Sequence, residues 1–489
     1  MHKNYINGKW IEAKSGKTFV KINPATEEEI GSFPYSAPED VDIAVKSAKN
    51  AFPKWSKLPI PTRGRIMRSF GDLMLEHKEE LARIETQEMG KVLKETRGDV
   101  QEGIDTAYYA FGEAVRFFGH TVPSELPNKI CLTFRRPVGV AGLITPWNFP
   151  AAIPCWKILP ALLSGNTIVL KPSRESPCTT TRLVELLIEA GVPDGVVNLV
   201  HGPGGVVGEA ICKHPDIGVV SFTGSGETGR RIAELGGKSL KKVSLELGGK
   251  NGQIVMNDAK LDLALDGVLW GAFGTTGQRC TATSRLILSD KIHDKFVTML
   301  IDRAKKLKIG NGLDESIEMG PLVSNSQREK VHKYVQIGKE EAKLVCGGSF
   351  YTADGCEKGF FYEPTIFTGV HQNMRIAQEE IFGPVLAVFK VCDLDEAINV
   401  LNSTGYGLSS SIYTQDVNTA MQAVERIEAG ITYVNGPTIG AECHLPFGGV
   451  KNTGNGHREG GWTVYEIFTE IQTVYIDYSG KLQRAQLDT

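Results

Sequence analysis

The sequence predicts an α/β fold with two parallel sheets, and three observations support that prediction. Short runs rich in β-branched residues alternate with helical patterns between residues 139 and 247. A second alternation of the same kind runs from about residue 253 to residue 434, whereas the first 120 residues read mainly as helices. Because strand–helix–strand units with short connections build parallel sheets covered by helices, the chain is expected to form two α/β domains.

Three stretches in the first 120 residues carry apolar side chains at helical spacing: residues 41–52, 65–85 and 92–118. Side chains three or four positions apart lie on the same face of a helix. Each stretch is therefore expected to form a helix that buries one face.

Five strands and four helices are expected in the first alternation. The strands are residues 139–144, 167–170, 196–200, 218–222 and 242–247, and the helices are residues 154–163, 177–190, 204–213 and 227–236. The second alternation has strand-like runs at residues 284–289, 386–391, 409–414 and 430–435. Ligands of open α/β sheets bind at the carboxyl ends of the strands, so motifs that follow the strands are the first candidates for a site.

Two extended segments, residues 129–140 and 473–480, belong to neither alternation. An isolated strand leaves backbone N–H and C=O groups open to other chains. The two segments are therefore expected to pair with one another or with a second subunit.

The composition favours a large globular enzyme and argues against several other classes. The 489 residues include 54 basic and 57 acidic side chains, which gives a net charge of −3 without a long run of one sign. Nucleic acid and an anionic membrane surface are therefore not expected as partners. The chain lacks an apolar stretch of about eighteen residues and an N-terminal apolar signal core, so neither a membrane span nor export is expected.

Nine cysteines are scattered along the chain without a C-x-x-C pair or a Cys/His metal spacing. This pattern is typical of reduced thiols and predicts a cytoplasmic protein with no metal site. Eight of the cysteines are interpreted as small core residues. Cys280, in TTGQRCTATS, differs because Arg279 is adjacent and small or hydroxyl residues surround it, which permits a reactive thiolate. A Cys–His hydrolase is possible, but no signature supports it.

Two glycine-rich turns are candidates for phosphate binding. The segment GSGETG, residues 224–229, follows a predicted strand and precedes a predicted helix. Glycines at such a place let the backbone approach a pyrophosphate at the helix N-terminus, although a plain turn has the same pattern. The segment GPGGVVG, residues 202–208, has a plain strand–helix turn as its simplest interpretation.

Two polar residues at predicted strand ends are candidates for catalysis. Asn148, in TPWNFP, is either a turn residue or a carboxamide that donates to an oxyanion. Glu246, in LELGGKN, ends a strand in apolar company. A partly buried carboxylate there would have a raised pKa suited to activating water, and the alternative is a strand-end pair with a lysine.

Seven motifs occur in one order between residues 145 and 454: TPWNFP, LKPSRESP, FTGSGETG, LELGGKN, GQRC, QEEIFGPV and PFGGVKNTG. Together they resemble the aldehyde dehydrogenase superfamily over nearly the whole chain. The resemblance implies a Rossmann-like cofactor-binding domain (residues 1–120 and 139–250) and an α/β catalytic domain (residues 251–450). It also implies a small β oligomerisation arm (residues 121–138 and 465–489), and hence a homodimer or homotetramer.

The resemblance implies NAD(P)-dependent oxidation of a small-molecule aldehyde to a carboxylic acid through a thioester, without a metal. Cys280 matches the family's nucleophile, Glu246 its general base and Asn148 its oxyanion-hole amide. The matched cofactor-binding positions are Thr145, Pro146, Trp147, Lys171, Ser173, Arg174, Gly204, Gly224, Ser225, Gly229, Leu247, Glu380 and Phe382. The matched substrate positions are Glu102, Phe149, Trp156, Arg279, Thr281 and Phe447.

The substrate motifs favour an aldehyde with a remote carboxylate. In the succinic-semialdehyde branch an arginine usually precedes the lysine of the helix after TPWNFP, whereas here Trp156 precedes Lys157. The tract around Cys280 and the loop VNGPTIGAECHLPFGG are more similar to 2-oxoglutaric- and α-aminoadipic-semialdehyde dehydrogenases. In the aminoadipic group the positions of Arg279 and Glu102 help to hold the substrate. The alternative is that Arg279 faces solvent and only tunes the thiol.

The cofactor motif favours NADP over NAD. In NAD-preferring members a glutamate typically stands three residues after the ribose-binding lysine. Here Arg174 has that position relative to Lys171, and the acid has moved to Glu175. An arginine would pair with a 2′-phosphate. If Arg174 points into solvent and Glu175 turns inward, dual use of NAD and NADP is expected instead.

Three alternatives remain open at this point: a generalist aldehyde dehydrogenase with an apolar tunnel, a CoA-acylating relative, and a non-catalytic binding protein on the same fold. Glu246 argues against the CoA-acylating relative, because that branch tends to lack a hydrolytic base. The presence of Cys280, Glu246 and Asn148 together argues against a protein without catalytic activity.

Overall fold

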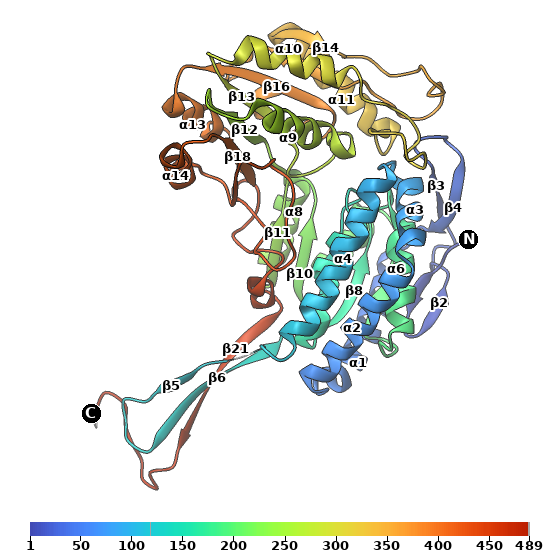
Figure 1. Ribbon diagram of the computed structural model, residues 1–489. Coiled ribbons are helices and arrows are strands. Elements are labelled where there is room, and N and C mark those ends of the chain that lie inside the picture. The colour runs from blue at the N-terminus through green and yellow to red at the C-terminus, as the bar shows by residue number, and fades with distance from the viewer. Residues whose placement is uncertain (118, 488–489) are drawn as a thin grey trace.

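The computed structural model describes residues 1–117 and 119–487. The chain forms two α/β units, each built on a seven-stranded sheet, and a long three-stranded projection (Figure 1). In Figure 1 the first unit lies at the lower right, the second lies above it, and the projection extends to the lower left. The predicted α/β fold class is confirmed. Position 118, where the predicted helix 92–118 ends, and positions 488–489 of the predicted arm lie outside the described residues.

The first sheet has the strand order β11-β10-β7-β8-β9-β1-β2. Its parallel strands are β7 (Val140–Ile144), β8 (Thr167–Lys171), β9 (Val197–Leu199), β10 (Ile217–Thr223) and β11 (Lys242–Glu246). All five were predicted to within two residues. The chain adds β8 and β9 on one side of β7 and then returns to add β10 and β11 on the other side. The strand order therefore reverses beside β7, where such sheets bind ligands.

The first 34 residues differ from the helical prediction. They form two antiparallel hairpins, β1 (Asn4–Ile6) with β2 (Lys9–Ile11) and β3 (Thr18–Ile22) with β4 (Glu29–Pro34). Strand β1 also pairs with β9 at the edge of the first sheet. Strands of three residues carry too little sequence periodicity to be recognised, and β1 is a strand because β9 offers it an open edge.

Eight helices cover the first sheet: α1 (Pro38–Ser56), α2 (Ile60–Glu76), α3 (Lys78–Met89), α4 (Leu93–Glu113), α5 (Ala152–Ser164), α6 (Pro177–Glu189), α7 (Glu209–Lys213) and α8 (Gly226–Gly237). The predicted helix 65–85 is two helices that meet at His77. The predicted helix 204–213 begins as a π-helical turn, Gly204–Gly208, and becomes α-helical only at Glu209.

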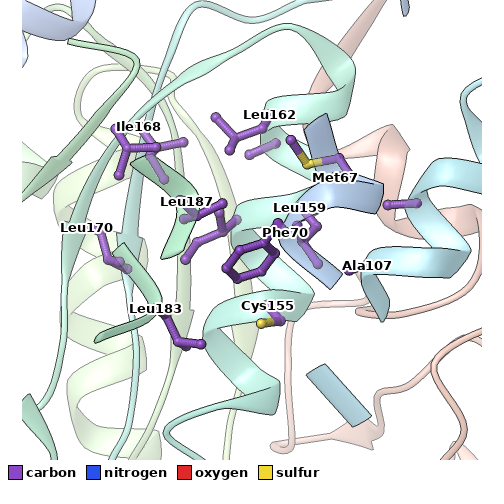
Figure 2. Close-up of a cluster of buried hydrophobic side chains, with 14 of the residues drawn as sticks. Met67, Phe70, Ala107, Cys155, Leu159, Leu162, Ile168, Leu170, Leu183 and Leu187 are labelled. Atoms are coloured by element: carbon purple, nitrogen blue, oxygen red, sulfur yellow. The ribbon is translucent and has the colours of Figure 1, made fainter. Parts of the chain in front are cut away.

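Helix α5 is buried along its whole length. Figure 2 shows its Cys155, Leu159 and Leu162 among Phe70 of α2, Leu170 of β8 and other apolar side chains. Each fully buried leucine contributes about 1.5–3 kcal/mol relative to an exposed one. The loop that carries Asn148 therefore leads into an element that the core holds firmly.

The second sheet has the order β14-β15-β16-β13-β12-β18-β19. Its strands are β12 (Asn251–Val255), β13 (Thr283–Ser289), β14 (Lys343–Cys346), β15 (Thr365–Thr368), β16 (Val385–Val391), β18 (Ser409–Tyr413) and β19 (Ile431–Val434). The helices around it are α9 (Leu261–Phe273), α10 (His293–Ala304), α11 (Asn325–Glu341), α12 (Arg375–Gln378), α13 (Leu394–Asn402) and α14 (Val417–Arg426). The four predicted runs lie in β13, β16, β18 and β19. A small pair, β17 (Tyr406–Gly407) with β20 (Val450–Lys451), lies outside the sheet.

The chain passes from the first sheet to the second in one short step. Strand β11 ends at Glu246, and β12 begins at Asn251. The carboxyl edge of the first sheet therefore faces the amino edge of the second. Residues that follow strands of the first sheet and residues that precede strands of the second meet between these edges.

The projection is an antiparallel sheet of β21 (Thr469–Asp477), β6 (Lys129–Pro137) and β5 (Thr121–Pro123). Strands β6 and β21 pair over nine residues, from Pro137 opposite Thr469 to Lys129 opposite Asp477. The two extended segments therefore pair with one another, as one of the two expectations stated. Among the described residues, none of the helices is both long and apolar enough to cross a membrane.

Candidate active site

The strand ends of the first sheet collect the residues that the motifs singled out. Asn148 follows β7, Lys171 ends β8, Ser225 follows β10 and Glu246 ends β11. Parallel strands end at one edge, so residues almost a hundred positions apart come together there. From the second sheet, Cys280 precedes β13.

The loop that leads to Cys280 is held in an unusual conformation. Thr275 and Thr276 have φ angles of 51° and 57°, which are rare for β-branched residues. Gly277 also has a positive φ, and a Cβ atom there would lie 2.2 Å from the carbonyl oxygen of Gly383. Backbone strain of this kind persists only where surrounding contacts enforce it.

Asn251 fixes the backbone on the other side of the nucleophile loop. Its Nδ2 donates to the carbonyl oxygens of Cys280 (2.8 Å) and Ala282 (2.9 Å). On the opposite flank, Nδ2 of Asn148 donates to the carbonyl oxygen of Gln278 (3.1 Å). The position of Cys280 is therefore set from both sides by buried amides.

A cavity of about 880 Å³ opens at Cys280. The predicted catalytic residues Cys280 and Glu246 line it, and so do all six predicted substrate residues, Glu102, Phe149, Trp156, Arg279, Thr281 and Phe447. The rings of Trp156 and Phe447 lie 5.0 Å apart and form an apolar wall next to Cys280. This volume is in the range of ordinary small-molecule sites.

Burial raises the pKa of the Cys280 thiol to about 12, and the negative charges of Glu246 and Glu380 contribute to the rise. The thiol is therefore protonated at neutral pH in the protein without ligands. A reaction that begins with the thiolate must first release this proton.

Glu246 has the properties of a general base for water. It is buried, and neither carboxylate oxygen accepts a hydrogen bond from any of the described residues. Burial, with the negative charge of Glu459, raises its pKa well above the ordinary value, while Lys157 and Arg458 oppose the rise. A carboxylate with unoccupied oxygens and a raised pKa is suited to accept a proton.

Several of the predicted dinucleotide positions lie at the carboxyl ends of strands of the first sheet. Ser225 caps α8 by accepting from the backbone N–H of Thr228 (3.3 Å). At Gly229, a Cβ atom would lie 2.4 Å from the Leu247 side chain, so this glycine lets α8 approach the end of β11. Gly204 begins the turn beside α7, with open space where a Cβ would be.

Lys171 is buried at the end of β8. Its Nζ donates to the carbonyl oxygen of Pro172 (2.6 Å). Burial lowers its pKa to about 8, with a smaller contribution from the positive charge of Arg174. Arg174 is exposed, with its guanidinium 6.0 Å from the centre of the Phe19 ring, and Glu175 pairs with buried Lys21 (3.3 Å). Among the described residues, Arg174 therefore has no acidic partner, whereas Glu175 is already paired with Lys21.

The positions expected at the nicotinamide, Trp147, Glu380 and Phe382, come from segments next to both sheets. The rings of Trp147 and Phe382 meet edge to face at 5.3 Å, and Phe382 has a φ of 60°. Glu380 accepts from the backbone N–H of Gly249 (3.0 Å). Burial raises the pKa of Glu380.

Polar groups with unused hydrogen-bonding capacity make these strand ends suited to a dinucleotide. Thr145 precedes Pro146 after β7, and its buried hydroxyl makes no hydrogen bond to any described residue. Ser173 accepts from the Glu175 backbone N–H (3.2 Å) and leaves its own hydroxyl hydrogen available. A capped helix N-terminus and strained Phe382 complete a site that fits pyrophosphate and nicotinamide.

Arg279 does not face solvent. Its Nη2 donates to Oε1 of Glu95 (2.7 Å), and the side chain is 9% exposed. The guanidinium carbon lies 5.5 Å from the centre of the Phe149 ring and 5.7 Å from the centre of the Trp270 ring. Of the two interpretations of Arg279, the one with a solvent-facing charge is wrong.

Residues 10–474 match the sequence profile of the Aldehyde dehydrogenase family. The chain belongs to this family. It is 41% identical over 475 residues to the alpha-ketoglutaric semialdehyde dehydrogenase of Bacillus subtilis strain 168, with 97% of each chain covered. It is 44% identical over 479 residues to the alpha-ketoglutarate semialdehyde dehydrogenase of Haloferax volcanii, with 97% of this chain and 99% of the relative covered.

A solved structure of this family superposes closely. The crystal structure of betaine aldehyde dehydrogenase from Staphylococcus aureus in complex with NAD+ has a TM-score of 0.96 and 37% identity, with 98% of this chain and 95% of that chain covered. The predicted family and the predicted enzyme class are confirmed. The protein is an NAD(P)-dependent aldehyde dehydrogenase.

Sequence reasoning missed two acids in the cavity of this aldehyde dehydrogenase. Glu459 pairs with buried Lys157 and accepts from Oγ1 of Thr223 (3.3 Å). Glu95 holds Arg279. The two pairs span 302 and 184 residues of sequence, and neither acid belongs to a recognisable motif. Glu102 was singled out, and it accepts from Nε1 of Trp156 (3.1 Å), with its pKa raised to about 7 by burial.

Proposed function

We propose that this enzyme oxidises an aldehyde that carries a remote carboxylate, of the 2-oxoglutaric-semialdehyde class, through a thioester on Cys280. The observation that carries the proposal is a cavity that holds the Cys280 thiol together with a buried arginine, Arg279. The names of the Bacillus and Haloferax relatives support the same substrate class. An apolar tunnel without a cation, as in a generalist enzyme, would lack this feature.

In the proposed mechanism, Cys280 attacks the aldehyde carbon as a thiolate, after its proton has passed to solvent. The developing oxyanion would be stabilised by the backbone N–H of Cys280 and by Asn148. The Asn148 amide has two N–H donors, and Gln278 takes only one of them, so the second remains for the oxyanion. A bound nicotinamide cofactor would supply the acceptor for the hydride that leaves the carbon, and a thioester would remain on Cys280.

Glu246 would then activate the water that hydrolyses the thioester. Its free oxygens and its raised pKa suit the transfer of a proton from water. Trp147, Phe382 and Glu380 would hold the nicotinamide end, while Ser225 and Lys171 would hold the pyrophosphate and the adenosine ribose. The apolar wall of Trp156 and Phe447 would exclude bulk water from the reacting carbon.

Replacing Arg279 with alanine is expected to remove the preference for a carboxylate. A charge-assisted contact contributes roughly 1.5–3 kcal/mol, so kcat/KM for 2-oxoglutaric semialdehyde should exceed that for an uncharged aldehyde of the same length about tenfold or more in the wild type. The ratio should fall toward one in Arg279→Ala. Arg303→Ala is the matched control, because Arg303 lines the same cavity but pairs with exposed Asp266. A wild type that treats both aldehydes equally would favour the generalist enzyme.

We further propose that the enzyme prefers NADP. A 2′-phosphate beside Lys171 would meet the free guanidinium of Arg174 and no unpaired acid, because Glu175 is engaged by Lys21. Arg174→Glu is expected to shift the NADP/NAD ratio of kcat/KM toward NAD by about tenfold or more, through loss of one charge-assisted contact and gain of repulsion. Steady-state kinetics with both cofactors measure this ratio, with Lys213→Glu as a surface control. A wild type that favours NAD would remove Arg174 from this role.

We also infer that the projection is an oligomerisation arm that makes the enzyme a homodimer or homotetramer. Its strands expose apolar side chains to solvent, among them Ile130, Phe134, Ile471 and Tyr475. Such faces promote aggregation unless another surface covers them. Deleting residues 473–489, which removes half of β21, should give monomers or aggregates in light scattering. Deleting residues 480–489 alone should leave the oligomer intact, and an unchanged subunit count in the longer deletion would refute the inference.

We also propose a division of labour between the two sheets and a cytoplasmic location. The first sheet, with residues 1–120 and 139–250, would bind the cofactor, and residues 251–450 would carry the nucleophile. Nine free cysteines, of which Cys392 is exposed, are compatible with a reducing compartment.

A further inference from the structure

Glu95 connects helix α4 to the loop that carries the nucleophile. Its two carboxylate oxygens accept from the backbone N–H of Thr275, at 3.0 and 2.8 Å, and Oε2 also accepts from the Thr275 hydroxyl (3.2 Å). Its Oε1 accepts from Nη2 of Arg279 (2.7 Å). The side chain is 10% exposed, so these bonds form largely away from water. Glu95 therefore holds the strained turn at Thr275 and the neighbouring Arg279 at once.

The same contacts determine which part of Arg279 is available to a ligand. Nε of Arg279 donates to the Thr275 hydroxyl (2.9 Å), and Nη2 donates to Glu95. Nη1 makes no hydrogen bond to any of the described residues, and Arg279 lines the cavity at Cys280. Because two of its nitrogens are bonded and the side chain is largely buried, the guanidinium has little freedom to turn. One edge of the guanidinium is thus fixed to the protein, and the other remains for a carboxylate.

The carboxylate of Glu95 also opposes binding of an anion. Its negative charge lies against the guanidinium, so a carboxylate in the cavity meets an arginine whose charge is already partly compensated. In a site shielded from water this opposition is stronger than it would be on the surface. The position of Glu95 therefore favours the selection of a carboxylate, whereas its charge weakens that selection.

We propose that Glu95 is a positioning residue that sets how strongly this enzyme selects a carboxylate-bearing aldehyde, by orienting Arg279 while offsetting its charge. The inference rests on the proposed function for its substrate class. The inference goes beyond the proposed function because it assigns the degree of selectivity to a residue that lies outside the family motifs.

Replacement by glutamine separates the two effects. In Glu95→Gln the carbonyl oxygen of the new side chain can take the place of Oε1 and accept from Arg279 and Thr275. The new amide group can donate to the Thr275 hydroxyl, which has a lone pair for it. The bond from the Thr275 N–H to Oε2 is lost, and the bond to the carbonyl oxygen in the place of Oε1 remains. Most of the geometry is therefore kept, and the charge is lost. Glu95→Ala removes both the hydrogen bonds and the charge. The positive φ angles of Thr275 and Thr276 are then no longer supported by the side chain of residue 95.

The first test compares kinetics with 2-oxoglutaric semialdehyde and with an uncharged aldehyde of the same length. In Glu95→Gln the kcat/KM ratio of charged to uncharged substrate should rise about fivefold, through KM, with kcat near the wild-type value. In Glu95→Ala, kcat should fall about tenfold or more with both aldehydes, because the loop before Cys280 is no longer fixed. Asp105→Asn is the matched control: it removes an exposed charge from the same helix, about 15 Å further along, and should change neither value.

The second test needs neither cofactor nor aldehyde. Iodoacetate and iodoacetamide alkylate the same thiolate, and only iodoacetate carries a carboxylate, so their rate ratio at Cys280 reports anion recognition independently of the thiol pKa. The rates are measured by mass spectrometry of the Cys280 peptide. The iodoacetate/iodoacetamide ratio should rise in Glu95→Gln and fall in Arg279→Ala.

The outcomes separate this inference from the substrate proposal. A wild type without preference among aldehydes, together with an alkylation ratio that rises in Glu95→Gln, would defeat the substrate class and uphold the role of Glu95. An alkylation ratio that stays within twofold of wild type in Glu95→Gln would overturn the role of Glu95. Glu95→Gln as impaired in kcat as Glu95→Ala would also overturn it, because the residue would then be only structural.

Discussion

Replacing Cys280 with alanine is expected to abolish aldehyde oxidation, with a loss of kcat of about 10⁴-fold or more. Without the sulfur, no thioester forms, and the remaining groups of the cavity can only bind the aldehyde. Reduced-cofactor absorbance measures the activity. Binding of NADP, followed by quenching of tryptophan fluorescence, should be retained because the proposed adenosine contacts lie at Lys171 and Ser225.

The matched control is Cys392→Ala. Cys392 is an exposed cysteine before α13, with its thiol donating to Glu396 (2.9 Å). Its replacement should leave kcat within about twofold of wild type, as expected for a surface position. Oxidation by Cys280→Ala at a tenth of the wild-type rate or faster would show that another group is the nucleophile.

Replacing Glu246 with glutamine is expected to stop the reaction at the thioester. The amide has the shape of the carboxylate but cannot accept a proton from water, so steady-state turnover should fall about 10²- to 10⁴-fold. The first turnover should survive, because the charge of Glu246 raises the pKa of Cys280, and its removal favours the thiolate. Rapid mixing should therefore show a burst of about one reduced cofactor per active site, followed by a stall.

The pH dependence of turnover provides a second measurement of the same role. The pKa of Glu246 is raised above its ordinary value, so the carboxylate that accepts a proton is populated only above that raised pKa. Wild-type kcat should rise with pH through this value where thioester hydrolysis limits the rate, and Glu246→Gln should lose this dependence on Glu246. Near wild-type turnover by Glu246→Gln would exclude Glu246 as the base.

Added CoA distinguishes hydrolysis from acyl transfer in the same variant. If CoA is the natural acceptor, turnover by Glu246→Gln should return to wild-type values when CoA is added. We expect no such recovery, because the proposed acceptor is water. Glu466→Gln is the control, because it makes the same replacement at an exposed glutamate, and it should show neither a burst nor a stall.

The gathering of the site could be predicted because it follows from topology. Asn148, Lys171, Ser225 and Glu246 come after or end strands that were recognisable as short β-branched runs. Parallel strands end at one edge of a sheet, so the closeness of these four residues can be predicted without knowledge of side-chain contacts. The hairpins β1–β4 escaped prediction for the opposite reason: their strands exist through pairing and docking, and three to six residues carry little periodicity.

The charge state of the site could not be predicted in the same way. Glu95 is a single acid at the start of a helix, and nothing in its neighbourhood in the sequence indicates that it will bind Arg279. Glu459 likewise meets Lys157 only after the chain has returned from the second sheet. Ion pairs between side chains far apart in sequence depend on how the helices and loops pack, and hydrophobic periodicity does not report that packing.

The sequence by itself determined the alternation of strands and helices, the order of the motifs and the chemical type of each reacting group: a thiol, a carboxylate and an amide. Only the tertiary structure decided the pKa values and the charged partners of these groups. Burial raises the pKa of both Cys280 and Glu246, and Arg279 meets its anion partner Glu95 before any substrate arrives. The physical reason is that residue type is local, whereas desolvation and Coulomb interactions depend on everything within several ångströms of an atom once the chain has folded.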